Sequence, residues 1–352
     1  MSAERRPGRC LYLLGPREVV LRVVELGPPG PGELLVAIDA ATTCGTDVKV
    51  YRRGGHPRML TVPTPFGHEL AGTVTATGPG AEEWPPGCRV VVANSASCGR
   101  CRYCRADREN LCPELVYLNG AFADAILVPA PFVRRSLYRV PEGLPPERAA
   151  LAEPLACVLH GIELCRPGER EDALVLGGGP IGLLFVATLA AGGHRVTLAD
   201  PNPPRLAVGR AMGAAQAVEI RDRTRGAREA REAAADELGF TLAVDATGSV
   251  SGWATVIDAV RPGGVVSLFG GCAPGTTLPL DTHRVHYSEL TLIGPYHHRP
   301  PNFASALDLL ASERLAVAPL LSARRPLAET REALESMIRR ETLKVVIDPA
   351  AG

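Results

Sequence analysis

Apolar and polar positions divide the chain into two parts with different periodicities. Up to about residue 130, short alternating or apolar runs are separated by glycine and proline, which is the pattern of β-strands. The predicted strands are Val19–Val24, Glu33–Ile38, Gly72–Thr77 and Arg89–Ala93. A short helical or turn segment is expected at Thr43–Asp47, directly after a strand. The first part is therefore predicted to be a β-rich, barrel-like domain.

After Pro145 the pattern changes to strands alternating with helices. A helical stretch over Pro145–Cys165 comes first, and the charged segment Arg223–Leu238 is expected to be a solvated helix. The other predicted strands are Ala173–Leu176, Val196–Ala199, Leu242–Asp245, Val265–Phe269 and Leu292–Gly294, and the other predicted helices are Ile181–Ala191, Pro204–Met212, Trp253–Val260 and Phe303–Ser312. This alternation predicts βαβ units around a parallel sheet. A last strand, Leu343–Ile347, is expected to return to the first domain.

Length and composition indicate a globular protein of two domains. The 352 residues exceed the size at which one hydrophobic core keeps growing, and 46% apolar with 22% charged residues is ordinary for a soluble protein. A net charge of zero gives no reason to expect nucleic acid or an anionic membrane as a partner. The segment Met1–Gly8 has no apolar core, so no signal peptide is expected and the chain is predicted to be cytoplasmic.

One apolar segment is long enough to cross a bilayer. Ala173–Gly193 contains 21 residues, but seven of them are glycine or proline. A membrane helix would not tolerate that number easily, so a strand, a turn and a helix are predicted instead.

Four cysteines with metal-ligand spacing occur within fifteen residues. Cys98, Cys101, Cys104 and Cys112 have the spacing C-x2-C-x2-C-x7-C, and four thiolates can surround one tetrahedral zinc. A disulfide scaffold is the alternative, but such scaffolds are short and the other six cysteines are scattered. The prediction is a structural zinc with no open coordination position.

A second set of zinc-type ligands lies upstream. Cys44 or His68 taken alone would more often be a buried thiol or a core histidine. Together with the carboxylates Glu69 and Glu153, however, they provide a thiolate, an imidazole and one carboxylate, which leaves a fourth position for water or substrate. Zinc at such an open site lowers the pKa of a bound alcohol, so this set is predicted to be catalytic.

A glycine-rich turn follows the strand Ala173–Leu176. The sequence from Gly177 to Gly182 fits G-x-G-x-x-G and precedes an apolar helix, whose N-terminus can bind a pyrophosphate. The predicted cofactor-binding residues of this turn are Gly177, Gly179, Pro180, Ile181 and Gly182. Asp200 ends the next strand, where a carboxylate can bind the adenosine ribose and repel a 2′-phosphate. NAD is therefore favoured over NADP, although Arg205 nearby weakens that preference.

Taken in order, these motifs make the chain resemble the zinc-containing medium-chain dehydrogenases/reductases, in the branch of the sorbitol and threonine dehydrogenases. The resemblance covers almost the whole length and rests on Cys44-Gly-Thr46-Asp47, Gly67-His68-Glu69, the four cysteines, Glu153-Pro154, Gly177–Gly182 and Asp200. It implies an α/β protein with a GroES-like β-barrel catalytic domain at 1–148, completed by about 290–352, and a Rossmann domain at 149–289.

The resemblance also implies roles for single residues. Cys44 and His68 would be ligands of the catalytic zinc, with either Glu69 or Glu153 completing the set. Thr46 would take the proton of the alcohol, and Asp47 would orient His68. Weaker correspondences place Thr247, Phe269 and Lys344 in contact with the nicotinamide half or the pyrophosphate.

Two positions depart from the family pattern. Relatives often have a histidine three residues after the Thr46-type hydroxyl to pass the proton to water, and this chain has Lys49 there. Near the C-terminus, His297 and His298 occupy the region where polyol dehydrogenases have an Arg-Tyr pair. These histidines are expected either to recognise a hydroxyl-rich substrate or to be ordinary surface residues.

The resulting expectation is a zinc-dependent, NAD-linked alcohol or polyol dehydrogenase (EC 1.1.1.-) with two zinc ions per chain. Its substrate would be a secondary alcohol of a polyol, sugar or cyclitol, with a threonine 3-dehydrogenase-like or aminocyclitol activity as the alternative. A non-catalytic nucleotide-binding relative is the competing class. By family analogy the protein would be a homo-oligomer, a tetramer or a dimer.

Overall fold

The structure is a computed structural model that describes residues 6–220 and 226–351, which form two compact units. The first unit takes the described residues of Met1–Ala156, Arg299–Ala311 and Leu321–Gly352. The second takes those of Cys157–His298 and Ser312–Leu320. Residues 1–5, part of the segment on which a signal peptide was judged absent, lie outside the described residues.

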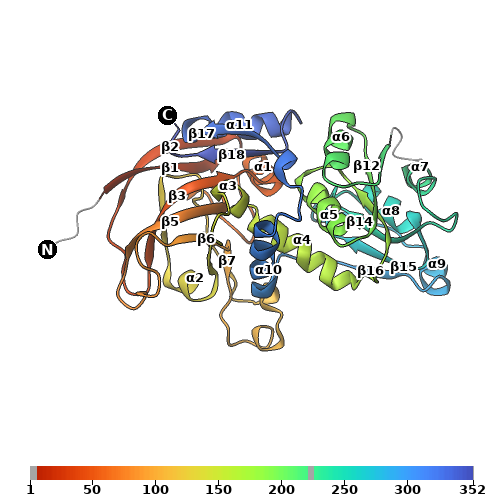
Figure 1. Ribbon diagram of the computed structural model, residues 1–352, viewed down its shortest axis with the longest axis horizontal. Coiled ribbons are helices and arrows are strands. Elements are labelled where there is room, and N and C mark those ends of the chain that lie inside the picture. Colours follow the sequence, from red (N-terminus) through yellow and green to blue (C-terminus); the bar gives the residue numbers. More distant parts are fainter. Residues whose placement is uncertain (1–5, 221–225, 352) are drawn as a thin grey trace. The chain divides into compact units, whose positions relative to one another are not determined.

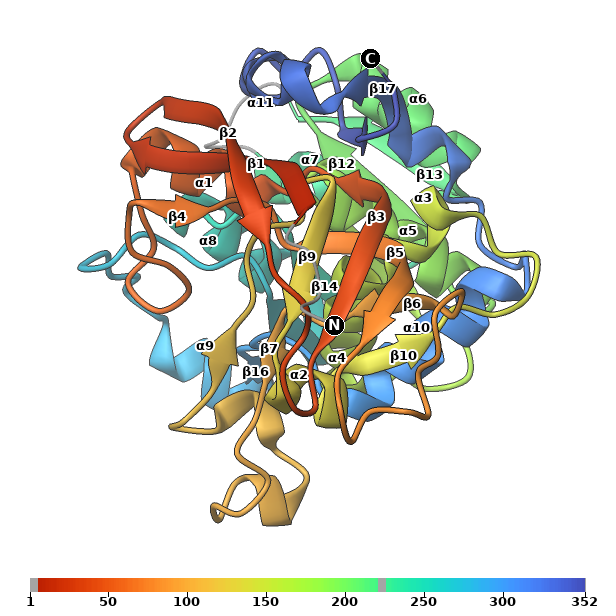
Figure 2. The ribbon, with the colours of Figure 1, turned by 90° about the vertical axis from the view of Figure 1, so that its left-hand side faces the viewer.

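The first unit is built on β-sheets. Its strands are β1 (Arg6–Gly15), β2 (Glu18–Leu26), β3 (Leu34–Thr42), β4 (Thr64–Pro65), β5 (Glu69–Thr77), β6 (Arg89–Val92), β7 (Ser95–Ala96), β8 (Val116–Tyr117), β9 (Ala125–Val128), β10 (Leu137–Arg139), β17 (Leu321–Pro326) and β18 (Lys344–Asp348). The main sheet has the order β10-β6-β5-β3-β18-β17, with β9 also paired to β3, and β2-β1-β4 form a second sheet (Figure 2).

Helices complete this unit. They are α1 (Gly45–Arg53), α2 (Ala130–Arg135), α3 (Pro146–Ala149), the start of α4 (Ala152–Cys165), α10 (Pro300–Ala311) and α11 (Thr330–Ile338). Short 3-10 turns occur at Cys104–Ala106, Glu109–Leu111 and Leu327–Glu329. The C-terminal elements β17, β18 and α11, blue in Figure 1, lie beside the red N-terminal strands of the same unit.

Strand β3 shows why these sequences form the core of the unit. Leu34, Val36 and Ile38 are buried, and the residues between them are partly exposed, as the side-chain alternation of a strand requires. On β18, Val346 pairs with Thr42 and Ile347 with Ala41 in antiparallel register. The expected return of the last strand to the first domain is therefore confirmed.

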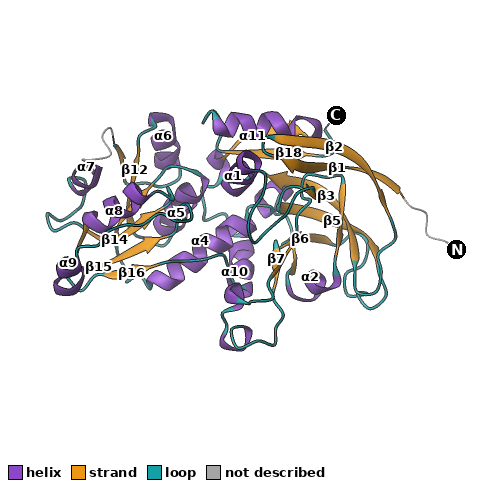
Figure 3. Cartoon of the chain, turned by 180° about the vertical axis from the view of Figure 1, so that it is seen from behind, coloured by secondary structure: helices purple, strands orange, loops and turns teal. Residues whose placement is uncertain are grey.

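The second unit contains one parallel sheet. Its strands are β11 (Asp172–Leu176), β12 (Arg195–Asp200), β13 (Gln216–Glu219), β14 (Phe240–Asp245), β15 (Val260–Leu268) and β16 (Thr291–Ile293). The helices between them are α5 (Pro180–Ala191), α6 (Pro203–Ala211), α7 (Gly226–Arg231), α8 (Val250–Ala259) and α9 (Thr282–Tyr287), and a 3-10 turn lies at Ala318–Leu320 (Figure 3). The order β13-β12-β11-β14-β15-β16 is that of a doubly wound dinucleotide-binding sheet.

Burial explains the long apolar runs of this unit. In β11, Ala173 to Leu176 are all buried, because helices cover both faces of a parallel sheet. The predicted strand–turn–helix at Ala173–Gly193 is confirmed as β11 followed by α5. Among the helices of the described chain, none is long and apolar enough to cross a membrane.

The predicted helical stretch Pro145–Cys165 consists of α3 and α4, because Pro154 lacks the N–H that a continuous helix would need and fits only in the first turn of α4. A second helix prediction needs correction. The segment Arg223–Leu238 is helical only at α7, Gly226–Arg231, and 221–225 lie outside the described residues. After α7, the Asp172 carboxylate accepts the N–H of Ala235 at 2.6 Å, so this backbone group is withdrawn from a helix.

Gly67, the residue before His68, is held against the core of the first unit. Its φ is +88°, and a Cβ there would lie 2.7 Å from the ring of Phe122, which is fully buried and packs edge-on against Phe66. Gly80 has a similar φ of +83°, yet a Cβ there would meet nothing within 4 Å.

We expect Gly67→Ala to destabilise the protein more than Gly80→Ala, by about 1–3 kcal/mol. Both substitutions strain a left-handed backbone, but only the first also forces Phe122 to move. Urea unfolding of the two variants measures the difference. Equal losses of stability would show that Phe122 yields without cost.

Candidate functional site

Cys44 lies at the start of helix α1 in a capping box. Its Sγ accepts the N–H of Thr46 at 3.4 Å, and the Asp47 carboxylate accepts the N–H of Cys44 at 2.9 Å. The first turn of α1 therefore fixes the thiol and carries the half-buried Thr46 beside it.

The other oxygen of Asp47 holds His68. Nδ1 of His68 lies 2.9 Å from Oδ1 of Asp47, and both side chains are buried. If Nδ1–H donates to Asp47, Nε2 is the nitrogen left for a metal, which is a common arrangement for a ligand histidine. One carboxylate thus orients both Cys44 and His68.

Glu69 is the first residue of β5 and is completely buried. Its Oε2 accepts hydrogen bonds from the Lys344 ammonium and from Thr42 Oγ1. Lys344 Nζ also donates to the carbonyl oxygen of Thr43 at 2.7 Å. Oε1 has no hydrogen-bond partner in the described part of the chain. Because buried polar atoms are nearly always satisfied, this oxygen marks a position for a group that the protein does not supply.

These residues form a compact set of ligands. One ligand atom each of Cys44, His68 and Glu69 lies within 4.8 Å of the others. Glu153, buried near the start of α4, is not within that distance of all three, although its electrostatic neighbours include His68 and Glu69.

Burial and neighbouring charges shift the pKa values of two residues at this cluster. Burial raises the pKa of Glu153 to about 7, with His68 opposing the shift and Glu69 adding to it. Burial disfavours the charged form of His68, but Asp47 and Cys44 outweigh it and raise the pKa of His68 well above its usual value. A metal would compete with protons for such ligands, so its binding would release protons.

The four cysteines form a second cluster in the first unit, on a loop that projects beyond the barrel strands (Figure 2). The Sγ atoms are 3.5 Å apart for Cys101 and Cys104, 3.9 Å for Cys101 and Cys112, and 4.0 Å for Cys98 and Cys104. Zinc–sulfur bonds of about 2.3 Å place tetrahedral sulfurs about 3.8 Å apart, so the spacing fits one zinc ion. The N–H of Cys98 also points to Cys112 Sγ, at 3.4 Å.

The glycine-rich turn lies between β11 and α5 in the second unit. Gly177 has a φ of +107°, and a Cβ on Gly182 would overlap the carbonyl oxygen of Gly177. Gly179 begins α5, and no side chain among the described residues caps that helix end. Its N–H groups are therefore available to an anion, as a bound pyrophosphate requires.

Asp200 ends β12 beside this turn. Oδ2 accepts the N–H of Gly178 at 2.6 Å, and Oδ1 accepts the N–H of Asn202 at 2.8 Å. A Cβ on Gly178 would approach both Asp200 and Arg205, so the predicted cofactor residues of the turn and the next strand do lie together. Asp200 therefore also stabilises the glycine-rich turn, through its hydrogen bond with the N–H of Gly178.

Two family models match the chain. One, described as the alcohol dehydrogenase GroES-like domain, matches residues 30–141, and the other, described as zinc-binding dehydrogenase, matches 180–312. D-altritol 5-dehydrogenase of Agrobacterium fabrum is 35% identical over 88% of this chain and 90% of its own length. The chain belongs to the zinc-containing medium-chain alcohol dehydrogenase family.

Further relatives of this medium-chain dehydrogenase agree. L-Threonine 3-dehydrogenase of a Chelativorans species is 32% identical over 92% of this chain and 94% of its own length. A crystal structure of a zinc-binding dehydrogenase from Sinorhizobium meliloti, bound to NADP, is 28% identical with a TM-score of 0.89. It covers 98% of this chain and is itself covered completely. The protein is an NAD(P)-dependent alcohol or polyol dehydrogenase with a GroES-like domain and a Rossmann-type sheet.

The sequence missed one organising residue of this dehydrogenase, Asp245 at the end of β14. Its buried carboxylate accepts the N–H of Thr247 at 3.2 Å, the hydroxyl of Thr247 at 2.6 Å and the N–H of Gly248 at 3.0 Å. The sequence did contain an indication of this role: Asp245 ends an apolar strand and is followed by Ala-Thr-Gly. Phe269 follows β15 and packs edge-on against Phe185 with centroids 5.1 Å apart.

Lys344 is a predicted cofactor residue whose ammonium binds a candidate metal ligand. It lies in the first unit, 1% exposed, with its ammonium engaged by Glu69 and Thr43. The structure thus gives the ammonium of Lys344 an ion pair with a candidate metal ligand, which the sequence did not predict.

His298 is not a surface residue. It is buried, its ring centroid is 4.1 Å from that of the half-buried His297, and burial followed by the nearby His297 keeps the pKa of His298 well below its usual value. The alternative of ordinary surface histidines is therefore wrong for His298.

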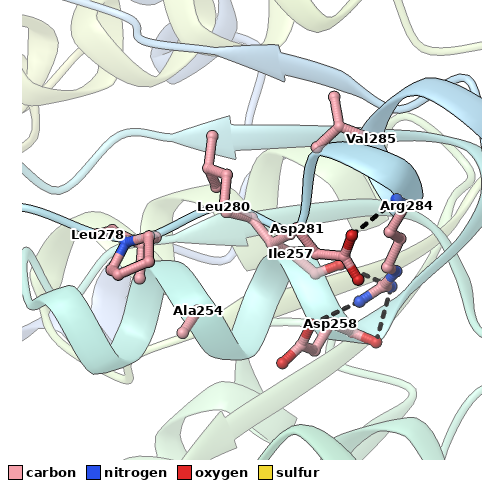
Figure 4. A pocket seen from close by; sticks show the side chains of 9 residues that line it. Ala254, Ile257, Asp258, Leu278, Leu280, Asp281, Arg284 and Val285 are labelled. Carbon is pink, nitrogen blue, oxygen red and sulfur yellow. Dashed lines mark hydrogen bonds and ion pairs between the residues drawn. The ribbon is translucent and has the colours of Figure 1, made fainter.

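A separate hollow in the second unit lies between α8 and the segment around α9 (Figure 4). Arg284 stabilises one side of this hollow. It donates to the carbonyl oxygen of Ile257 at 2.9 Å and forms an ion pair with Asp258 at 2.5 Å. None of the residues predicted for chemistry lines it. It is not part of the candidate site.

We expect Asp47→Asn to weaken zinc binding at the cluster of Cys44, His68 and Glu69 by about 10- to 100-fold, because the amide no longer orients His68 as a carboxylate does. Chelator competition with a metal count measures the effect. Asp39→Asn is the matched control, since Asp39 accepts the hydroxyl of Thr73 at 2.8 Å and is not one of the clustered ligands. Equal zinc affinities in the two variants would contradict the orienting role of Asp47.

Proposed function

We propose that the protein oxidises a secondary alcohol of a polyol, sugar or cyclitol and transfers the hydride to NAD, with a catalytic zinc held by Cys44, His68 and Glu69. The observation that carries the proposal is the buried Oε1 of Glu69, which lies next to thiolate and imidazole ligands and has no hydrogen-bond partner in 6–220 or 226–351. Three protein ligands leave a fourth position for a substrate oxygen. Glu153 is the reserve carboxylate close by.

The residues fit the chemistry of such a site. A bound zinc supplies Lewis acidity toward the alcohol oxygen, and a bound nicotinamide accepts the hydride. Thr46, the second residue of α1 and close to Cys44, would take the proton of the alcohol while its own hydroxyl proton passes on to solvent. Asp47 keeps His68 in the tautomer that presents Nε2. Lys49, exposed on the same helix, stands where relatives pass the proton to water.

A second zinc in the four-cysteine loop is part of the proposal. The sulfur separations support tetrahedral coordination by Cys98, Cys101, Cys104 and Cys112. With all four positions taken by protein, such an ion stabilises the loop and does not bind substrate.

For the cofactor, the proposal assigns the pyrophosphate to the turn Gly177–Gly182 and the adenosine ribose to Asp200. Arg205, Thr247 and Phe269 are the other proposed cofactor contacts. NAD is favoured over NADP because a second negative charge beside Asp200 is repelled. The protein is further expected to be cytoplasmic. It is also expected to be a homotetramer or dimer, and light scattering tests this oligomeric state.

One alternative activity has specific support. The similarity to a threonine 3-dehydrogenase at 32% identity keeps a 3-hydroxy amino acid in consideration, and an aminocyclitol is chemically close. A non-catalytic nucleotide-binding relative is disfavoured because all of Cys44, Thr46, His68, Glu69 and Glu153 are retained.

The test combines metal analysis with a substrate panel. We expect two zinc ions per chain and reduction of NAD, followed at 340 nm, with polyols, sugars or cyclitols rather than threonine. Cys44→Ser should remove one zinc and reduce turnover by at least about 1,000-fold with the fold intact. Cys101→Ser should instead lose the other zinc and lower thermal stability. Wild-type turnover by Cys44→Ser would overturn the catalytic assignment.

Cofactor choice gives a separate prediction. Asp200→Asn keeps an acceptor for the turn but removes the negative charge, so the preference for NADH over NADPH should fall about tenfold or more. Fluorescence titration of both cofactors measures it. Glu219→Gln, at the end of the adjacent strand β13, is the control for loss of a charge. An unchanged ratio for Asp200→Asn would remove the ribose role from Asp200.

A further inference from the structure

Lys344 and Glu69 form a fully buried ion pair at the metal-ligand cluster. Lys344 is 1% exposed and Glu69 is 0% exposed. The ammonium and the Thr42 hydroxyl both bind Oε2 of Glu69, whereas Oε1 has no hydrogen-bond partner among the described residues. The cation therefore compensates the carboxylate without taking the oxygen that remains for a metal.

The position of Lys344 is fixed by the backbone on both sides. Strand β18 pairs with β3, the N–H of Val345 donates to Thr43 Oγ1 at 2.9 Å, and the N–H of Thr43 donates to Val345 O at 3.0 Å. Lys344 Nζ reaches the carbonyl oxygen of Thr43 as well, at 2.7 Å. The ammonium is thus held in place by contacts within the protein.

In the metal-free protein, Asp47 is paired with His68, whereas the positive charge beside the buried carboxylate of Glu69 is that of Lys344. A buried carboxylate is costly unless a positive charge lies next to it. In the metal-free protein, the ammonium of Lys344 supplies that charge directly at Glu69.

We propose that Lys344 is a positioning residue that keeps the metal ligands assembled in the metal-free protein, with Glu69 held as a carboxylate that has one oxygen open. The proposal rests on the zinc site of the proposed function. It predicts that zinc and Lys344 partly substitute for one another as counter-charges of Glu69. Removing Lys344 should therefore harm the metal-free form more than the zinc-loaded form.

Thermal unfolding tests this with two samples. One holds one zinc per chain, with the proposed catalytic site empty, and the other holds two, and the metal content of each is checked. We expect the gap in Tm between the two forms to widen by about 5 °C or more in Lys344→Met, since breaking a buried ion pair is costly and zinc then relieves more of that cost. Lys344→Arg should restore the gap of the unmodified protein. Lys49→Met, which removes an exposed ammonium from α1, should leave the gap unchanged.

A parallel fall of both Tm values in Lys344→Met would show a merely structural lysine and would overturn the proposal. The Glu69→Gln background separates charge from packing, because Lys344→Met should have little further effect on the one-zinc form there. If Lys344→Met alone does not fold, folding of the double variant Lys344→Met/Glu69→Gln supports the proposal, and failure of both contradicts it. An unmodified protein that never takes a second zinc would instead contradict the proposed function.

Discussion

The pairing of strand β18 with β3 is the constraint on which the candidate metal site depends. It joins residues about 300 positions apart in the sequence, continues the main sheet of the first unit, and sets Lys344 beside Thr42, Thr43 and Glu69. Strand β5, which lies on the other side of β3, contributes Glu69, and the residue before that strand is His68. Two neighbours of one strand thus deliver a ligand and its counter-ion to the same place.

Electrostatics at this place is balanced through shared carboxylates. Asp47 serves Cys44 with one oxygen and His68 with the other, and Glu69 divides its two oxygens between protein donors and an open position. Each carboxylate therefore performs two tasks whose geometry is linked. The same economy appears in the second unit, where Asp200 accepts two N–H groups and Asp245 binds the loop of Thr247. Buried acids therefore organise the candidate metal site in the first unit and the loops that follow β12 and β14 in the second.

The spacing of the sequence motifs predicted most of the clustered ligand residues, whereas hydrophobic periodicity predicted a smaller share of the strands and helices. Cys44, His68, Glu69 and the four cysteines come together as their ligand chemistry required, and the parallel sheet followed from alternating patterns. The elements that were not predicted include strands β1, β13 and β17 and helix α11, because segments of mixed polarity are decided by tertiary pairing rather than by local pattern. The ion pair of Lys344 with Glu69 was not predicted either, because the sequence does not show which distant strands pair.

The discontinuous first unit has a consequence for the order of events during synthesis. Every residue of the dinucleotide-binding unit has been made by Leu320, whereas Lys344–Asp348 emerges later. Domains fold as units while the chain grows, so the parallel sheet can be complete while the barrel still lacks a strand. A nascent chain therefore contains Cys44, His68 and Glu69 before Lys344 has been made, so the ion pair between Lys344 and Glu69 can form only near the end of translation.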